Sequence, residues 1–443
     1  MKKKLLSIFI CLALVAAVLS GCSSKVDNTD ETGTDTETTK APKDDTSGNE
    51  EAETISFMCW YDEDDMANVI NALNEELGGK YVVEYTYVAL SDYNNVLSTQ
   101  LSAGEGPDVI ADGSNFPARI KAGNVVEITG SDYLADLNEA GFALCSDGDK
   151  IYGIPSYGWF SGVWYNQDVL DQSGVTELPN TYDEFVAMCE KIAAAGYLPL
   201  GFGLADGDTA LHSLVGYLEN SFYHNNGENT LGIDFDTEFA KGNKTLNGNI
   251  NNAVAKWATL VEKGYITSEM LGISNEEALN NFIAGKSAMF YGGPWQYTSF
   301  ADAGMNFGMM PHLSESGENK YMVGGPAVNF GVNVNSKKMD GAQAVLKALS
   351  SISVQQAFVD ANVGGFSYRA GVVADMPKEY DNVAEIINSG NIACTWDRWS
   401  VNMPSQSLID EAKAQLQGIV SGDYTVEEFV GSLDMRADTI RYE

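Results

Sequence analysis

Short apolar runs alternate with longer amphipathic runs in this chain, and this alternation limits its fold more than any other feature. Residues 55–60, 81–88 and 109–111 are short and apolar, which predicts strands. Residues 64–77 and 91–103 place apolar side chains at helical spacing, which predicts helices between those strands. A β-α-β-α-β order indicates a mostly parallel sheet with helices on both faces. We therefore expect an α/β protein.

Polar and aromatic side chains follow two of these strands directly. In parallel sheets, ligands bind beyond the carboxyl ends of the strands. This rule points to Tyr61 and Asp62 after the first strand, and to Asp112 and Ser114 after the third.

The N-terminus predicts export and a lipid anchor. Lys2, Lys3 and Lys4 precede an apolar run at residues 5–19, which is typical of a signal peptide and too short for a comfortable membrane span. The Leu-Ser-Gly-Cys segment that ends at Cys22 resembles the lipobox of bacterial lipoproteins. That resemblance implies removal of residues 1–21 and diacylation of Cys22, and the alternative is a plain signal peptide with an incidental cysteine.

Composition separates a tether from a folded body. Residues 22–53 are rich in Ser, Thr, Asp and Glu and can bury almost nothing, so we expect a disordered tether there. Residues 54–443 exceed what one hydrophobic core usually supports, which favours two lobes. The net charge of −36 argues against nucleic acid as a partner, because phosphates would be repelled.

The sequence offers little that is typical of an enzyme or a metal site. Its three histidines form no metal-binding pair, and no nucleophile-elbow motif is present, so we expect no catalytic residue, no metal and no cofactor. A glycosidase would need only two carboxylates, and with 62 acidic residues the sequence neither locates nor excludes such a pair. None of the body's cysteines has redox-motif or zinc-site spacing, and we favour free buried thiols over two disulfides for Cys59, Cys145, Cys189 and Cys394.

Five further segments carry recognisable motifs. They are residues 103–109 (AGEGPDV), 150–155 (KIYGIP) with 164–168 (WYNQD), 178–185 (LPNTYDEF), 282–290 (FIAGKSAMF) and 293–295 (GPW). Physically, Thr181 is expected to cap a helix, and residues 285–287 to form a turn into a buried strand rather than a phosphate loop. In order and content, the five segments resemble the extracellular solute-binding proteins of ABC importers, family 1, the carbohydrate-binding group.

The resemblance implies a periplasmic-binding-protein-like fold of two α/β lobes, with an interlobe cleft and a hinge that the chain crosses three times. We expect crossings near residues 154–156, 322–325 and 363–365, which are rich in Gly or Pro. Lobe one would comprise residues 54–155 plus 323–362, and lobe two residues 156–322 plus 363–443.

A sugar site needs flat aromatic platforms and short polar groups that donate and accept hydrogen bonds. The loops after the strands offer that mixture, although any single Trp could equally belong to the core. Trp295 is favoured because it follows a Gly-Gly-Pro turn and matches the family's stacking Trp. The predicted ligand contacts are Tyr61, Asp62, Asp112, Ser114, Tyr157, Trp159, Trp295, Trp396 and Trp399.

The resemblance thus implies a monomeric, membrane-anchored receptor outside the cytoplasm that delivers a sugar or oligosaccharide to ABC permease subunits. Three alternatives stay open: the same fold binding a peptide, polyamine or other small solute, a sensor that partners a receptor kinase, and a surface glycan hydrolase.

Overall fold

The computed structural model describes residues 52–224, 230–317, 320–374 and 376–441. The predicted signal peptide, Cys22 and nearly all of the predicted tether lie outside these residues. Within the described ranges, no helix is both long enough and apolar enough to span a membrane.

The first lobe contains a five-stranded sheet in the order β2-β1-β3-β12-β6. Strand β1 pairs in parallel with β2 and β3, while β12 is antiparallel to β3 and β6. These pairings confirm the predicted parallel β-α-β-α-β series. The strands are β1 (Glu53–Cys59), β2 (Tyr81–Tyr87), β3 (Val109–Asp112), β6 (Ile154–Pro155) and β12 (Asn329–Val332), with a separate small pair, β4 (Ser146–Asp147) and β5 (Lys150–Ile151).

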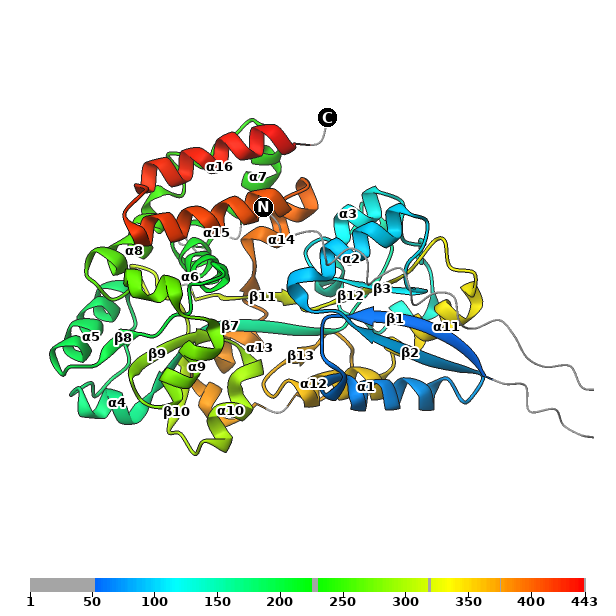
Figure 1. Ribbon diagram of the computed structural model, residues 1–443, viewed down its shortest axis with the longest axis horizontal. Helices are drawn as coiled ribbons and strands as arrows, with labels where there is room; N and C mark the ends of the chain where they lie inside the picture. The colour runs from blue at the N-terminus through cyan, green and yellow to red at the C-terminus, as the bar shows by residue number, and fades with distance from the viewer. Residues whose placement is uncertain (1–51, 225–229, 318–319, 375, 442–443) are drawn as a thin grey trace, which may run out of the picture. The chain divides into compact units, whose positions relative to one another are not determined.

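Helices cover this sheet, with α1 below it and α2 above it in Figure 1. Helix α1 begins after Asp62 because the Asp62 carboxylate accepts a hydrogen bond from the Asp65 N–H, at a first turn that is itself acidic. The helices are α1 (Glu63–Glu76), α2 (Leu90–Ser102), α3 (Phe116–Lys121), η1 (Asp132–Leu134), η2 (Glu139–Phe142), α11 (Met339–Leu349) and α12 (Ile352–Ala361).

The second lobe is built around one long strand, β7 (Tyr157–Asn166), which leads from the end of β6 in the first lobe into the second lobe (Figure 1). Five strands follow the order β14-β11-β7-β9-β8, and β10 and β13 also pair with β7. Most of these pairings are antiparallel, unlike those of β1, β2 and β3. The other strands are β8 (Leu198–Leu200), β9 (Ser287–Gly292), β10 (Phe307–Met310), β11 (Met322–Pro326), β13 (Phe366–Ser367) and β14 (Ile392–Ala393).

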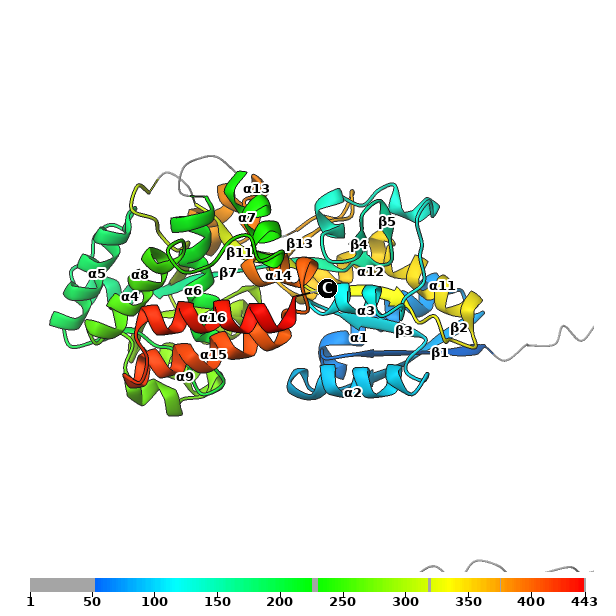
Figure 2. The same ribbon diagram turned by 90° about the horizontal axis from the view of Figure 1, so that it is seen from above.

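Helices form most of the second lobe, and α15 and α16 run side by side in Figures 1 and 2. Thr181 and Glu184 form a reciprocal capping box at the start of α5, which confirms the predicted helix start. The helices are α4 (Gln167–Gln172), α5 (Tyr182–Ala194), α6 (Asp208–Leu218), η3 (Glu219–Tyr223), α7 (Thr230–Ala240), α8 (Asn251–Glu262), η4 (Ser268–Gly272), α9 (Asn275–Ile283), η5 (Pro294–Gln296), α10 (Tyr297–Asp302), η6 (Lys378–Tyr380), α13 (Asp381–Asn388), α14 (Thr395–Asn402), α15 (Gln406–Ser421) and α16 (Val426–Ile440).

The first two crossings between the lobes lie side by side. Ser156, between β6 and β7, donates its backbone N–H to the Val328 carbonyl over 2.8 Å, and its side-chain oxygen accepts the Val328 N–H over 3.1 Å. Val328 lies between β11 and β12, so the chain returns to the first lobe there and not at residue 323. Residues 323–326 instead belong to the second sheet, because β11 pairs with β7.

The third crossing also lies later than the sequence predicts. After β13, Tyr368 and Arg369 still pair with the first lobe, where the Asn138 N–H donates to the Tyr368 carbonyl over 2.8 Å. Val372 and Ala374 pack against the core of that lobe, and the chain joins the second lobe by η6. The boundary predicted at residue 363 is therefore about ten residues too early, since β13 and the segment after it had no sequence signal of their own.

The four cysteines of the folded body are free and buried, in agreement with the favoured prediction. Burial raises the pKa of the Cys59 and Cys189 thiols to about 12, so these groups stay protonated and behave as small apolar side chains.

Candidate functional site

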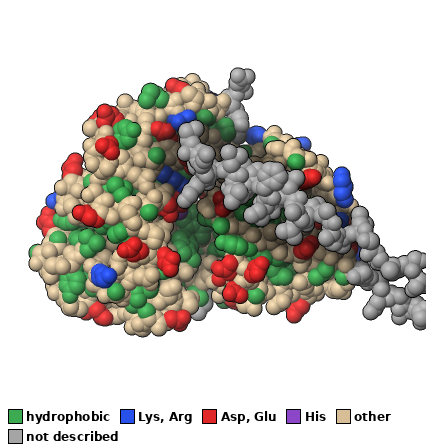
Figure 3. Space-filling model, viewed as in Figure 1, with side chains coloured by type: hydrophobic (Ala, Val, Ile, Leu, Met, Phe, Trp, Pro, Cys, Tyr) green, Lys and Arg blue, Asp and Glu red, His purple; other side chains and the backbone are tan. Residues whose placement is uncertain are grey.

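An aromatic cluster lies where the two lobes meet, and we define it as Tyr61, Tyr157, Trp159, Trp295 and Trp396. Tyr157 and Trp159 are two residues apart in β7 and so share one face of that strand. Trp159 packs against the hydrophobic cores of both lobes. Figure 3 shows hydrophobic side chains lining a hollow between the lobes on the face it presents. The strand that connects the lobes therefore also carries the centre of the cluster.

Trp295 is the most exposed member of the cluster, with 46% of its surface accessible. Its ring lies over Gly293, where an added Cβ would come within 2.3 Å of the ring atoms, so this backbone position must be glycine. The ring centroids of Trp295 and Trp159 are 6.1 Å apart and inclined at 56°. This exposure excludes the alternative that Trp295 is a core residue, and it leaves a broad aromatic face open to a ligand.

Trp396 stacks with Trp159 and is itself buried. The two rings are nearly parallel, at 11° and 6.4 Å, and Trp396 is only 7% exposed. The Trp396 ring also stacks with the His212 ring, and the two ring centroids are 4.5 Å apart. Burial lowers the pKa of His212 to about 4, so the imidazole is neutral near pH 7. An uncharged aromatic stack therefore backs the exposed rings.

Hydroxyl groups fix the part of the cluster that faces the first lobe. The Tyr61 and Tyr157 oxygens are 3.1 Å apart, and the Tyr157 hydroxyl donates to the Asn362 side-chain oxygen over 3.1 Å. Tyr85 donates to the Tyr61 backbone carbonyl over 2.5 Å. Burial raises the pKa of Tyr61 well above its ordinary value, so this hydroxyl is neutral. The chain of hydroxyl contacts holds Tyr61 and Tyr157 in one orientation.

Two hydrogen bonds cross between the lobes beside this cluster. Ser114, which follows β3, donates to Asp397 of α14 over 2.9 Å, and Asn115 donates to Gln406 over 3.1 Å. Figure 2 shows α14 beside α3. Burial raises the pKa of Asp397 to about 7, against the opposing effects of the Ser114 hydrogen bond and of Arg398.

A buried ionic cluster lies behind Asp397, and we define it as Glu219, Asp236 and Arg398. Arg398 donates to Glu219 over 2.8 Å and to Asp236 over 2.7 Å, and both carboxylates are nearly inaccessible. Thr395 also donates to Glu219, over 2.7 Å. Although burial alone would raise it, the pKa of Glu219 is held below its ordinary value, chiefly by the charge of Arg398. These contacts fasten α14 to the second lobe.

Three predicted ligand contacts have local structural roles. Trp399, predicted from the sequence as a sugar contact, is 3% exposed in the second core, 6.1 Å from Phe239, and lies outside the aromatic cluster. Asp112 is 3% exposed and forms an ion pair with Arg119 over 2.8 Å, so its carboxylate is used inside the first lobe. The exposed Asp62 caps α1, as described above.

The structure brings several residues to the site that were not predicted from the sequence. His212, Asn362 and Gln406 come from three distant segments, and no local pattern marks them. Among the described residues, no group of three or more His, Cys, Asp or Glu side chains could hold a metal ion.

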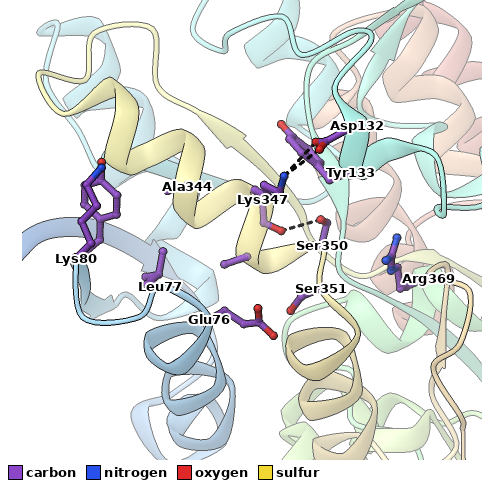
Figure 4. Close-up of a pocket in the computed structure, with 12 residues that line it drawn as sticks. Glu76, Leu77, Lys80, Asp132, Tyr133, Ala344, Lys347, Ser350, Ser351 and Arg369 are labelled. Atoms are coloured by element: carbon purple, nitrogen blue, oxygen red, sulfur yellow. Dashed lines mark hydrogen bonds and ion pairs between the residues drawn. The ribbon is translucent and has the colours of Figure 1, made fainter.

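A pocket of about 430 Å³ lies elsewhere on the first lobe, between the ends of α1 and α11. An ion pair between Lys347 and Asp132 crosses it, at 3.0 Å (Figure 4). None of the predicted site residues lines this pocket.

Known proteins share both the sequence pattern and the fold. Residues 63–356 match the profile of the family described as bacterial extracellular solute-binding protein. The multiple sugar-binding protein of Streptococcus mutans is 24% identical over 279 residues, covering 61% of this chain and 65% of that protein. The galactooligosaccharide-binding protein of Bacillus subtilis is 27% identical over 258 residues, covering 56% of this chain and 57% of that protein. Each alignment thus spans less than two thirds of the relative.

A solved structure agrees with the two-lobed arrangement. The family 1 extracellular solute-binding protein from Bifidobacterium longum subsp. infantis superposes with a TM-score of 0.70 at 23% identity, covering 88% of this chain and 99% of that chain. This likeness establishes the fold.

Proposed function

This chain belongs to the bacterial extracellular solute-binding protein family, and we propose that it binds a sugar or oligosaccharide at the aromatic cluster. The observation that carries this proposal is the exposed ring of Trp295 beside Trp159. A sugar ring has an apolar C–H face that stacks on such a platform, and a rim of hydroxyls that hydrogen-bond to neighbouring polar groups. The names of the two sugar-binding relatives support the same class of ligand.

The charges around the cluster favour a neutral ligand. Arg398, the nearest cation in the sequence to Trp396 and Asp397, is engaged by two carboxylates and is not available to an anionic ligand. His212 is neutral near pH 7. The platform thus offers aromatic faces and uncharged hydroxyls, which suit a neutral saccharide.

In this proposal the lobes close around the ligand, and the closed form delivers the sugar to the permease subunits of an ABC importer. The ligand must bind the closed form more tightly than the open form, because equal affinity would shift no population. The family supports a location outside the cytoplasm. We further propose that the protein acts as a monomer held to the membrane by diacylglyceryl on Cys22.

The anchor is tested by metabolic labelling with a radioactive fatty acid. Cys22→Ala removes the acylated thiol and is expected to abolish labelling, while the control Cys11→Ala, within the predicted signal peptide, keeps it. Equal incorporation in Cys22→Ala and the parent would contradict the anchor.

Ligand binding is tested by thermal shift and calorimetry against a panel of neutral mono- and oligosaccharides. A true ligand at a hundredfold excess over its dissociation constant stabilises the protein by about 2.7 kcal/mol. Stabilisation by a peptide or polyamine panel, with none by any saccharide, would overturn the proposed ligand class. Release of a cleavage product during long incubation would indicate a hydrolase instead.

A further inference from the structure

The hydrogen bond between Ser114 and Asp397 joins residues from different lobes. Ser114 lies between β3 and α3 in the first lobe, and Asp397 lies in α14 of the second, 283 positions away in the sequence. Asn115, the next residue, donates to Gln406, the first residue of α15. Two neighbouring bonds therefore connect one short loop of the first lobe to two helices of the second.

Asp397 cannot follow Ser114 if the lobes separate, because its own helix is fixed. Arg398, its chain neighbour, is held by Glu219 and Asp236 inside the second lobe. Trp396, the neighbour on the other side, is packed against both Trp159 and His212. Opening of the lobes would therefore break the Ser114 bond instead of stretching it.

The surroundings of Asp397 depend on both lobes. One of its carboxylate oxygens faces Gly325 of β11, where an added Cβ would lie 3.1 Å away, and the other accepts the Ser114 hydroxyl. A buried carboxylate without a partner is costly, whereas a hydrated one is not. Closing the lobes over this carboxylate therefore costs less free energy while Ser114 is there to donate to it.

We propose that Asp397 is a positioning residue that couples closure of the two lobes to ligand binding through its hydrogen bond with Ser114. Its coupling to the ligand rests on the proposed function, whereas its effect on closure does not. Asp397 follows directly on Trp396 of the aromatic cluster, so a ligand that orders the cluster also orders the contact. The Ser114 hydroxyl, predicted from sequence to touch the sugar, acts here as the partner of Asp397.

The test uses the full chain and a matched control. Ser114→Ala removes the donor between the lobes, and Ser336→Ala removes a similar serine–aspartate bond within the first lobe, from Ser336 to Asp108 over 2.7 Å. Small-angle X-ray scattering without ligand measures closure, and calorimetry with the best saccharide measures affinity. We expect a larger radius of gyration and about threefold to tenfold weaker affinity for Ser114→Ala, and neither change for Ser336→Ala.

A double-mutant cycle separates coupling from independent roles. Asp397→Ala on the Ser114→Ala background should add no further loss of affinity and should relieve part of it, because the carboxylate left without its donor is then also gone. The proposal is overturned if the two substitutions weaken affinity by independent factors that multiply in the double mutant. It is also overturned if Ser114→Ala keeps the radius of gyration and the affinity of the parent. If Ser114→Ala unfolds, Asn115→Ala probes the same loop and must enlarge the radius for the proposal to hold. If Ser114→Ala enlarges the radius of gyration but the parent protein binds no saccharide, the contact between the lobes is supported and the proposed function is contradicted.

Discussion

The two lobes contribute to the site in different ways. In the first lobe, the polar side chains at the ends of the parallel strands are engaged locally, as Asp62 caps a helix and Asp112 pairs with Arg119. In the second lobe, the segment after β9 leaves Trp295 46% exposed. A residue at the carboxyl end of a strand is therefore not by itself a ligand contact, because the fold can use the same side chain for its own stability.

Both lobes also bury an arginine, and the two arginines differ in their partners. Arg119 pairs with Asp112 and also donates to Ser98 and Asn94. Arg398 lies between two carboxylates, Glu219 and Asp236. The second lobe therefore depends on its arginine more strongly.

The largest effect should come from Arg398→Met, which leaves two carboxylates buried without a cation. We expect a loss of about 3 to 5 kcal/mol in the free energy of unfolding, measured by urea denaturation. Arg119→Met should cost less, because it exposes only Asp112 to this penalty, and burial already raises the pKa of that carboxyl. An equal or greater loss for Arg119→Met would break the comparison between the lobes.

Trp295→Ala should act on binding rather than on folding. Loss of an exposed platform should weaken saccharide affinity by about 2 kcal/mol, or roughly thirtyfold, measured by calorimetry. The free energy of unfolding should change by less than about 1 kcal/mol, because the ring is half exposed. Tyr424→Ala is the matched control, since Tyr424 is 44% exposed and far along the chain in the second lobe. Unchanged affinity in Trp295→Ala would remove the platform from the proposal.

The pKa of Asp397 gives a pH test of the boundary between the lobes. In the structure, where the Ser114 contact joins the lobes, the pKa of Asp397 is about 7, above the ordinary 3.8, so a form with this contact holds a proton more tightly than an open form with a hydrated carboxylate. The stabilisation of the closed form is therefore greatest at low pH and is lost as the pH rises from about 4 to about 7. Ligand affinity should fall over that window, by at most about tenfold per pH unit, and level off above it.

Several groups face Asp397 and belong in that test. Ser114 comes from the first lobe, Tyr368 from the segment after β13, Glu219 from η3, Cys394 from the N-cap position before α14, and Arg398 from α14 itself. Asp397→Asn should remove the fall in affinity, whereas Glu139→Gln, at an exposed position of the first lobe, should retain it. A fall that persists in Asp397→Asn would assign the pH dependence to another group.

Trp399→Phe should have the smallest effect on binding. The indole nitrogen of Trp399 has no hydrogen-bond partner among the described residues, and its ring lies in the second core. We expect a loss of about 1 kcal/mol in unfolding free energy from imperfect packing and no change in affinity. Weaker affinity with unchanged stability would return Trp399 to the site.

Sequence reasoning located some parts of the molecule well and others poorly. The strands and helices from β1 to β3 were predicted to within about two residues, because each has its own hydrophobic period and end signals. The later crossings at Val328 and after Ala374 were displaced from the predicted Gly-rich segments. There the chain's path depends on which strand pairs with β7, and a pairing partner hundreds of residues away leaves no local pattern.

The α/β class, the capped start of α5 and the aromatic residues available to a site could be read from the sequence alone, because these follow from neighbours within a few positions. Which aromatic side chains are exposed depends on the packing of the whole chain: Trp295 is 46% exposed and Trp399 is 3% exposed, although the sequence offers both as candidates for the site. The same holds for Asp112 and Asp397, whose roles depend on Arg119 and Ser114. Burial and partner choice are properties of the packed chain, since each is set by side chains that the fold brings from distant segments.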